Sequence, residues 1–341
     1  MTSIIFPNTF DDIRKLVASA PGPNLDNAQK VREREIQLTK PTGALGRLEA
    51  LSEWTASWQE HYPPAIHNAV ICVFAGSHGI AEKQVSAYPP SVNRQMLDNF
   101  INEGAGINAL SHTIGCKVQV IELDMDRPTH DFTEQAAMSE AECVHAFTEG
   151  MKAVPEKCDI LAVGELGIGN TTTAAAIYCG LFGGNASDWV GRGSGVDDEG
   201  LKRKCDVVAA GLELHRGFLK DPLQVLARMG GREIAAIAGA VLMARLRRIP
   251  VVLDGFICCS GPAVLYALLP SALDHCLAGH VSAEGAHGRV LKQLGKEPVL
   301  SLGMRLGEGT GAVLAIGIVK AALDAHNRMA TFAEASVDNK L

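Results

Sequence analysis

Glu308 is the residue whose surroundings most clearly suggest chemistry. It stands between Gly307 and Gly309, after a short apolar stretch and before a long apolar segment of helical character. Glycines let the backbone approach a ligand closely, and the neighbours of Glu308 offer no polar surface to which a solvated carboxylate would belong. We therefore predict that Glu308 is a catalytic base. The alternative is a carboxylate that only complements the positive end of the following helix.

A second glycine-rich segment, residues 164–171, has the outline of a phosphate loop between a strand and a helix. It carries Asn170 where a P-loop requires lysine, which disfavours a kinase or ATPase. Free backbone N–H groups and hydroxyls at a helix N-terminus suit a single phosphate monoester. A tight turn and helix cap without any ligand is the simpler alternative.

A third glycine-rich turn, residues 191–195, precedes a helix that opens with acidic residues and continues with Lys202, Arg203 and Lys204. It fails as a dinucleotide fingerprint, because the expected strand before it and the acidic residue about 20 positions after it are missing. The turn could bind a further anion or a ribose. A solvated charged helix is the simpler interpretation of the three basic residues.

Three histidines, His78, His280 and His287, raise the question of a metal site. No two histidines stand four residues apart on a predicted helix, and no clustered acidic ligand set accompanies them. We therefore expect neither a metal nor another cofactor, and we interpret His78 as a structural hydrogen-bonding residue. The chain also lacks a G-x-S-x-G elbow and a cysteine with an evident histidine partner, which disfavours covalent acyl chemistry.

The composition restricts the class of protein. The 341 residues are 47% hydrophobic and 20% charged, which is typical of a globular chain with a large core. A net charge of -7 disfavours nucleic acid as a partner. The nine cysteines are scattered without a C-x-x-C pair, as expected for reduced core thiols. The longest apolar stretches are too short for a membrane span, and the N-terminus lacks signal-peptide features, so we expect a cytoplasmic protein.

The elements that position these residues alternate between strands and helices. We predict strands at residues 69–74, 118–123, 160–163, 250–253 and 299–302. We predict helices at residues 135–152, 171–181, 201–219, 232–247 and 283–294. This alternation indicates an α/β fold, a parallel sheet with helices on both faces. Ligands of such sheets bind beyond the carboxyl ends of the strands, so the segments that follow the strands should form one site.

The two ends of the chain contain helical patterns and no predicted strand. We therefore expect residues 1–60 and 311–341 to pack together as a small helical subdomain. Residues 61–310 would form the α/β catalytic domain.

Four motifs, in this order, resemble the family of nicotinate-nucleotide:dimethylbenzimidazole phosphoribosyltransferases. They are residues 40–49, 164–172, 252–256 and 305–311. Members of this family act in cobalamin biosynthesis and transfer the phosphoribosyl group from nicotinate mononucleotide to 5,6-dimethylbenzimidazole without a metal. The resemblance implies a Rossmann-like sheet with a small helical domain, two small-molecule substrates and a homodimer.

The resemblance also assigns roles to individual residues. Glu308 matches the family's catalytic glutamate, which takes a proton from one benzimidazole nitrogen while the other nitrogen attacks the anomeric carbon. Glu165 matches a second acidic position that would orient the ribose or assist Glu308. The candidate phosphate and ribose contacts are Gly167, Asn170, Thr171, Gly191, Gly193, Lys204 and Ser282. The candidate walls of the base pocket are Ser77, Tyr88, Met96, Met304 and Leu306.

The identity of the base remains open from the sequence. Ser77 departs from the Asp or Asn that is common in the family, and related members accept adenine, other benzimidazoles or phenols. A non-catalytic nucleotide-binding or sensor protein with the same fold is the main alternative. An NAD-dependent oxidoreductase is disfavoured, because no acidic ribose anchor follows a glycine turn at the required distance.

Overall fold

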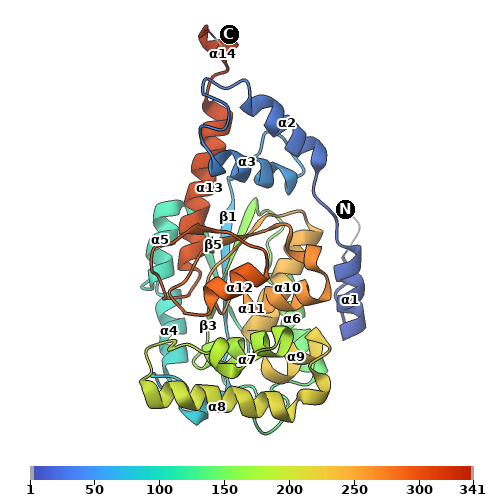
Figure 1. The fold of residues 1–341 in the computed structure, drawn as a ribbon, viewed down its shortest axis with the longest axis vertical. Coiled ribbons are helices and arrows are strands. Elements are labelled where there is room, and N and C mark those ends of the chain that lie inside the picture. The colour runs from blue at the N-terminus through green and yellow to red at the C-terminus, as the bar shows by residue number, and fades with distance from the viewer. Residues whose placement is uncertain (1–3, 339–341) are drawn as a thin grey trace.

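A six-stranded parallel sheet forms the centre of the molecule in the computed structural model, which describes residues 4–338 (Figure 1). The strand order is β2-β1-β3-β4-β5-β6, and every pair of neighbouring strands is parallel. The strands are β1 (Ala69–Ala75), β2 (Cys116–Glu122), β3 (Ile160–Leu166), β4 (Val251–Leu253), β5 (Cys276–His280) and β6 (Pro298–Leu300). This arrangement confirms the predicted α/β class.

Strand β1 shows why the sheet must be covered on both faces. All seven of its residues are buried. Val70, Cys72 and Phe74 pack into one hydrophobic core, whereas Ile71 and Val73 pack into the other. Because successive side chains of a strand point to opposite faces, a continuous apolar run needs an apolar layer on each side.

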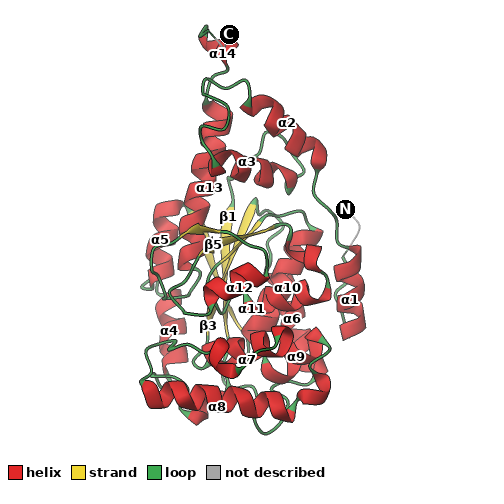
Figure 2. Ribbon diagram, viewed as in Figure 1, coloured by secondary structure: helices red, strands yellow, loops and turns green. Residues whose placement is uncertain are grey.

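Helices supply both layers (Figure 2). The core on one face is built mainly with α6, α7, α9, α10 and α11, and the core on the other face with α4, α5 and α13. The helices are α1 (Phe10–Ser19), α2 (Leu25–Glu35), α3 (Arg47–Ser57), α4 (Val92–Ile101), α5 (Gly106–Ile114), α6 (Glu140–Ala153), α7 (Asn170–Phe182), α8 (Asp198–Leu214), α9 (Pro222–Met229), α10 (Arg232–Leu246), α11 (Ser260–Leu268), α12 (His287–Gln293), α13 (Thr310–Arg328) and α14 (Phe332–Ala335).

One strand was not predicted. The five predicted strands correspond to β1, β2, β3, β4 and β6, but β5, which lies between β4 and β6, was missed. Its sequence, Cys-Leu-Ala-Gly-His, contains no β-branched or aromatic side chain that would favour a strand. Tertiary pairing with both neighbours decides its conformation, and it places His280 at the edge of the sheet where ligands bind.

The two ends of the chain are arranged differently from the prediction. Helices α2 and α3 pack on each other and on α13, but α1 packs against the α/β body beside α11 (Figure 1). The backbone N–H of Phe10 donates a hydrogen bond of 3.0 Å to Glu140 at the start of α6. Helix α13 also covers the sheet through its contacts with β3, β4 and β5. The predicted boundaries at residues 60 and 311 therefore do not separate two packing units.

Residues 1–3 and 339–341, which the domain prediction included, lie outside the described residues. Whether the helical ends fold as an independent unit stays a prediction. Between residues 4 and 338, the helices are all too short or too polar to cross a membrane.

Candidate active site

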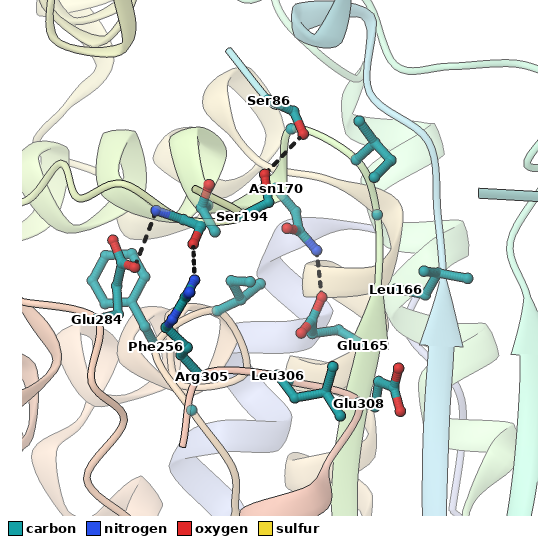
Figure 3. A pocket seen from close by; sticks show the side chains of 18 of the residues that line it. Ser86, Glu165, Leu166, Asn170, Ser194, Phe256, Glu284, Arg305, Leu306 and Glu308 are labelled. Atoms are coloured by element: carbon teal, nitrogen blue, oxygen red, sulfur yellow. Dashed lines mark hydrogen bonds between the residues drawn. The ribbon is translucent and has the colours of Figure 1, made fainter. Parts of the chain in front are cut away.

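A cavity of about 400 Å³ opens at the carboxyl edge of the sheet (Figure 3). Its walls come from the segments after β3, β4, β5 and β6, together with the loop before α4 and the turn before α8. Cavities of this size accommodate small organic ligands. The position agrees with the rule that parallel sheets bind ligands beyond the carboxyl ends of their strands.

The segment that carries Glu308 has an unusual backbone. Gly307, Glu308 and Gly309 are three consecutive residues in the left-handed region, with φ values of 84°, 61° and 88°. Glycine adopts this conformation freely, but for glutamate it costs about 1–2 kcal/mol. Such a cost is retained where the surrounding structure imposes it, which is common at functional sites.

Two neighbouring residues impose this conformation. The buried carboxylate of Asp254, just after β4, accepts hydrogen bonds from the backbone N–H groups of Gly309 (3.1 Å) and Ala312 (2.9 Å). Gly164 in β3 packs against the backbone of Glu308, and a Cβ atom at position 164 would lie 2.6 Å from the Glu308 carbonyl carbon. The start of α13 is thus fixed against two strands of the sheet.

The Glu308 carboxyl group is well suited to accept a proton. It is 6% exposed, and its Oε2 accepts a hydrogen bond of 3.2 Å from the N–H of Ile107 in the first turn of α5. Burial raises the pKa of Glu308, the Ile107 N–H opposes this rise, and the negative charge of Asp254 adds to it. A raised pKa makes the carboxylate a stronger base.

Glu165, the penultimate residue of β3, has a pKa far above that of an ordinary glutamate. Burial raises its pKa to about 8, although a hydrogen bond from the Asn170 side chain opposes the rise. The nearby carboxyl groups of Glu233, Asp254 and Glu308 raise it further. Glu165 therefore retains a proton at neutral pH and can donate a hydrogen bond to a ligand.

Groups that suit an anion lie at the start of α7. Thr171 lines the cavity, and its hydroxyl accepts a hydrogen bond of 3.0 Å from the ammonium group of Lys204. Lys204 is 1% exposed and also donates to the Gly191 carbonyl at 2.7 Å. Burial lowers its pKa to about 8, and Glu284 opposes that shift. The lysine thus places a positive charge directly behind a helix N-terminus, a combination that favours phosphate.

Known proteins identify the family. The protein named nicotinate-nucleotide–dimethylbenzimidazole phosphoribosyltransferase from Methylocella silvestris is 54% identical over 331 residues, which is 97% of each chain. The protein of the same name from Sinorhizobium fredii is 51% identical and covers 97% of this chain and 98% of its own. Residues 20–337 also match a family model described as phosphoribosyltransferase. This chain belongs to the nicotinate-nucleotide–dimethylbenzimidazole phosphoribosyltransferase family. It is an enzyme, a pentosyltransferase.

Solved structures agree with this assignment. The crystal structure of CobT from Thermus thermophilus superposes with a TM-score of 0.86 at 38% identity, and covers 92% of this chain and 100% of its own. A second structure of the dimethylbenzimidazole phosphoribosyltransferase from the same organism gives 0.85 at 37% identity, with 92% and 99% covered.

The cavity of this transferase brings together most of the residues singled out from the sequence. Those that line it are Glu165, Gly167, Asn170, Thr171, Gly193, Ser282, Glu308, Tyr88, Met96 and Leu306. Gly191 and Lys204 lie behind the wall: Lys204 acts through Thr171, and the α-carbon of Gly191 packs against the Glu284 carboxyl group. Figure 3 shows the Asn170 side chain directed at the Glu165 carboxyl group, with Leu306 nearby. Arg305 donates a hydrogen bond of 3.3 Å to the Gly193 carbonyl.

Two residues predicted for the base pocket lie elsewhere. Ser77 lines a second, smaller cavity of about 290 Å³ and donates a hydrogen bond of 2.8 Å to the Met125 carbonyl. Met304 is not among the lining residues, and its carbonyl joins the loop after β6 to Ala283 in the loop after β5. Both residues lie a few positions after a strand, which correctly places them near the carboxyl edge of the sheet. Their distance from the strand along the sequence does not say whether a loop side chain points into the cavity.

Several lining residues were missed. Ser86, Val92, Ser194, Ile257 and Glu284 line the cavity without having been assigned a role. Ser86 lies in the connection from β1 to α4, beyond a short 3-10 helix (Gly79–Lys83), and its hydroxyl meets that of Ser194 at 3.2 Å (Figure 3). No local sequence signal joins these two serines, because they are 108 positions apart.

The three histidines considered as metal ligands do not form one cluster: the rings of His280 and His287 lie 6.1 Å apart, whereas His78 has other partners. His78 contacts Glu233 at 2.7 Å and Thr173 at 3.3 Å, in line with a structural role. His287 accepts a hydrogen bond of 2.8 Å from the N–H of Ser282 and so fixes the loop after β5. Within residues 4–338, no three His, Cys, Asp or Glu side chains are grouped so as to hold a metal ion.

Proposed function

We propose that this enzyme transfers the phosphoribosyl group of nicotinate mononucleotide to 5,6-dimethylbenzimidazole, with Glu308 as general base. The products would be α-ribazole 5′-phosphate and nicotinate, and the reaction belongs to the assembly of the nucleotide loop of cobalamin. The relatives that carry this name support the choice of substrates. The observation that carries the mechanism is the buried Glu308 carboxyl group, held by a strained backbone at one end of a cavity whose other end suits phosphate.

The two ends of the cavity would bind different parts of the substrates. The phosphate would lie at the N-terminus of α7, where Thr171 and Gly193 line the wall and Lys204 adds charge. The Gly193 N–H donates a hydrogen bond of 3.2 Å to the Glu284 carboxylate, which a bound phosphate would have to replace. The flat apolar base would lie against Met96, Tyr88 and Leu306. In this arrangement the anomeric carbon would lie between the residues that bind the phosphate and Glu308.

The chemistry requires a base but little help for the leaving group. One benzimidazole nitrogen attacks the anomeric carbon while Glu308 takes the proton from the other nitrogen. The bond to nicotinate breaks at the same carbon, and its electron pair neutralises the cationic pyridine ring. The attack occurs opposite the departing ring, so the β linkage of the donor becomes an α linkage. Glu165, which holds a proton at neutral pH, would donate a hydrogen bond to the ribose.

Glu308→Gln tests the role of the base. The amide keeps the size of the side chain but cannot take a proton, so we expect kcat to fall by about 10²–10⁴-fold with little change in mononucleotide binding. Glu103→Gln is the matched control, because Glu103 is an exposed glutamate with a positive φ of 59° that lines no part of the cavity. The assay is nicotinate release that depends on added dimethylbenzimidazole.

Each outcome of this assay is informative. Full activity in Glu308→Gln would remove Glu308 as the base. No benzimidazole-dependent release by the unaltered enzyme would refute the proposed reaction itself and favour a nucleotide-binding protein without catalysis.

We also propose that the enzyme is a homodimer and acts in the cytoplasm. All nine cysteines are free and all but Cys205 are buried, which supports a reducing compartment. Light scattering of the purified protein tests the dimer, since a monomeric mass at micromolar concentration would contradict it.

A further inference from the structure

His280 is a buried histidine without a hydrogen-bond partner. It ends β5, is 2% exposed, and lines the cavity. Neither of its ring nitrogens has a partner among the described residues. A buried polar group without a partner is unfavourable, and at the wall of a cavity it indicates a missing ligand.

The other buried histidines of residues 4–338 show that this is an exception. Each of them has a partner for at least one ring nitrogen; they are His78, His215, His275, His287 and His326. Burial in this protein is thus normally accompanied by hydrogen bonding of the imidazole. His280 differs because its ring belongs to the site.

Packing, not hydrogen bonding, fixes the ring of His280. The α-carbon of Gly311 lies against it, and a Cβ atom there would come within 2.5 Å of Nε2. Asp254 Oδ1, which accepts the N–H of Ala312, lies 3.4 Å from Nε2, within ion-pair distance but without a hydrogen bond between them. A Cβ atom at Gly255 would lie 3.6 Å from Nε2, so a side chain at that position would cover the imidazole. Both ring nitrogens are nevertheless enclosed, with less than 1 Å² of exposed area each, so a ligand reaches them only after a small movement of the ring or its neighbours.

The surroundings of His280 select the kind of ligand group. Asp254 is in contact with the ring and Glu165 lines the same cavity, so a carboxylate or phosphate would be repelled there. Each imidazole nitrogen is either a donor or an acceptor, depending on whether it carries a proton. A hydroxyl group can partner either nitrogen, because it both donates and accepts.

The position of His280 identifies which hydroxyl group this is. Ser282, two residues further along the same loop, also lines the cavity, as do Thr171 near the phosphate end and Glu308 at the base end. The part of a mononucleotide between its phosphate and its base is the ribose. We propose that His280 binds a ribose hydroxyl of the mononucleotide and so gives the site its preference for a sugar phosphate over phosphate alone. This inference rests on the proposed function, which supplies the substrate class.

Binding of two simple probes tests the inference without turnover. The affinities of inorganic phosphate and ribose 5-phosphate are measured by titration calorimetry for the unaltered enzyme, His280→Phe and His280→Asn. We expect the unaltered enzyme to prefer ribose 5-phosphate, and His280→Phe to lose about threefold to tenfold of that preference, the contribution of one neutral hydrogen bond. Its phosphate affinity should not change. His280→Asn, which retains hydrogen-bonding groups, should lose less.

His275→Asn is the matched control, because His275 is buried in the same strand region but bonds to the Val241 carbonyl. It should keep the preference even if it lowers stability. An unaltered preference in folded His280→Phe, or no preference for ribose 5-phosphate in the unaltered enzyme, would overturn the inference. If His280→Phe does not fold, an unaltered preference in His280→Asn would do the same. Failure of the proposed function would appear separately, as absent nicotinate release.

Discussion

Replacing Gly164 by alanine should displace Glu308 without touching the cavity. The new Cβ atom would lie 2.6 Å from the Glu308 carbonyl carbon and 2.9 Å from the Gly309 nitrogen. Carbon atoms in favourable contact are about 3.5–4.0 Å apart, so the Glu308 backbone and β3 must separate by nearly 1 Å. A misplacement of that size in a reacting group costs about 10²-fold in rate.

We therefore expect kcat of Gly164→Ala to fall by about 10-fold to 100-fold, and the free energy of unfolding to fall by about 1–3 kcal/mol through overpacking. The matched control is Gly288→Ala in α12, where an added Cβ atom would have nothing within 4 Å. Benzimidazole-dependent nicotinate release and thermal unfolding are measured for both variants. If Gly164→Ala has the same kcat as Gly288→Ala, contact with β3 does not position the base.

Two further predictions concern pH. The folded chain keeps the proton of Glu165 up to about pH 8, whereas an unfolded chain releases it near pH 4.5, so this carboxyl group lowers the stability of the fold progressively as pH rises through this range. Glu165→Gln should therefore melt at a higher temperature than the unaltered enzyme at pH 8, and the difference in melting temperature should shrink toward pH 5. A difference that grows toward pH 5 would contradict burial of the carboxyl group as the cause. Burial lowers the pKa of Lys204 to about 8, so the phosphate affinity of the unaltered enzyme should fall as pH rises through 8. Lys204→Met, which has no ammonium group, should bind phosphate weakly at every pH. Equal phosphate affinities of the unaltered enzyme and Lys204→Met at pH 7, measured by calorimetry, would rule out a role for the ammonium group.

Much of the fold was predictable because its signals are local. The apolar run of β1 requires burial on both faces whatever surrounds it, and the alternation of strands and helices indicates a parallel sheet. β5 was not predictable in this way, because Leu277 and Ala278 have no strong strand preference and the pairing with β4 and β6 decides their conformation.

Some residues of the candidate site can be recognised from the sequence, and others only from the structure. Glycines beside Glu308 and the loop at Asn170 are visible in the sequence because close backbone approach and left-handed turns demand glycine. The direction of the Ser77 side chain is not visible, and neither is the approach of Ser86 to Ser194, since both depend on how loops far apart in the chain are packed.

The sequence by itself determined the class of fold and the family, and it singled out Glu308, which we propose as the base. The fold class follows from periodicity, the family from the resemblance of four motifs in order, and the choice of Glu308 from the glycines on each side of it. Only the tertiary structure decided that Glu165 keeps a proton, that Lys204 acts from behind the wall and that His280 lacks a partner. Burial and the proximity of charges set these properties, and both arise only when distant segments of the chain meet.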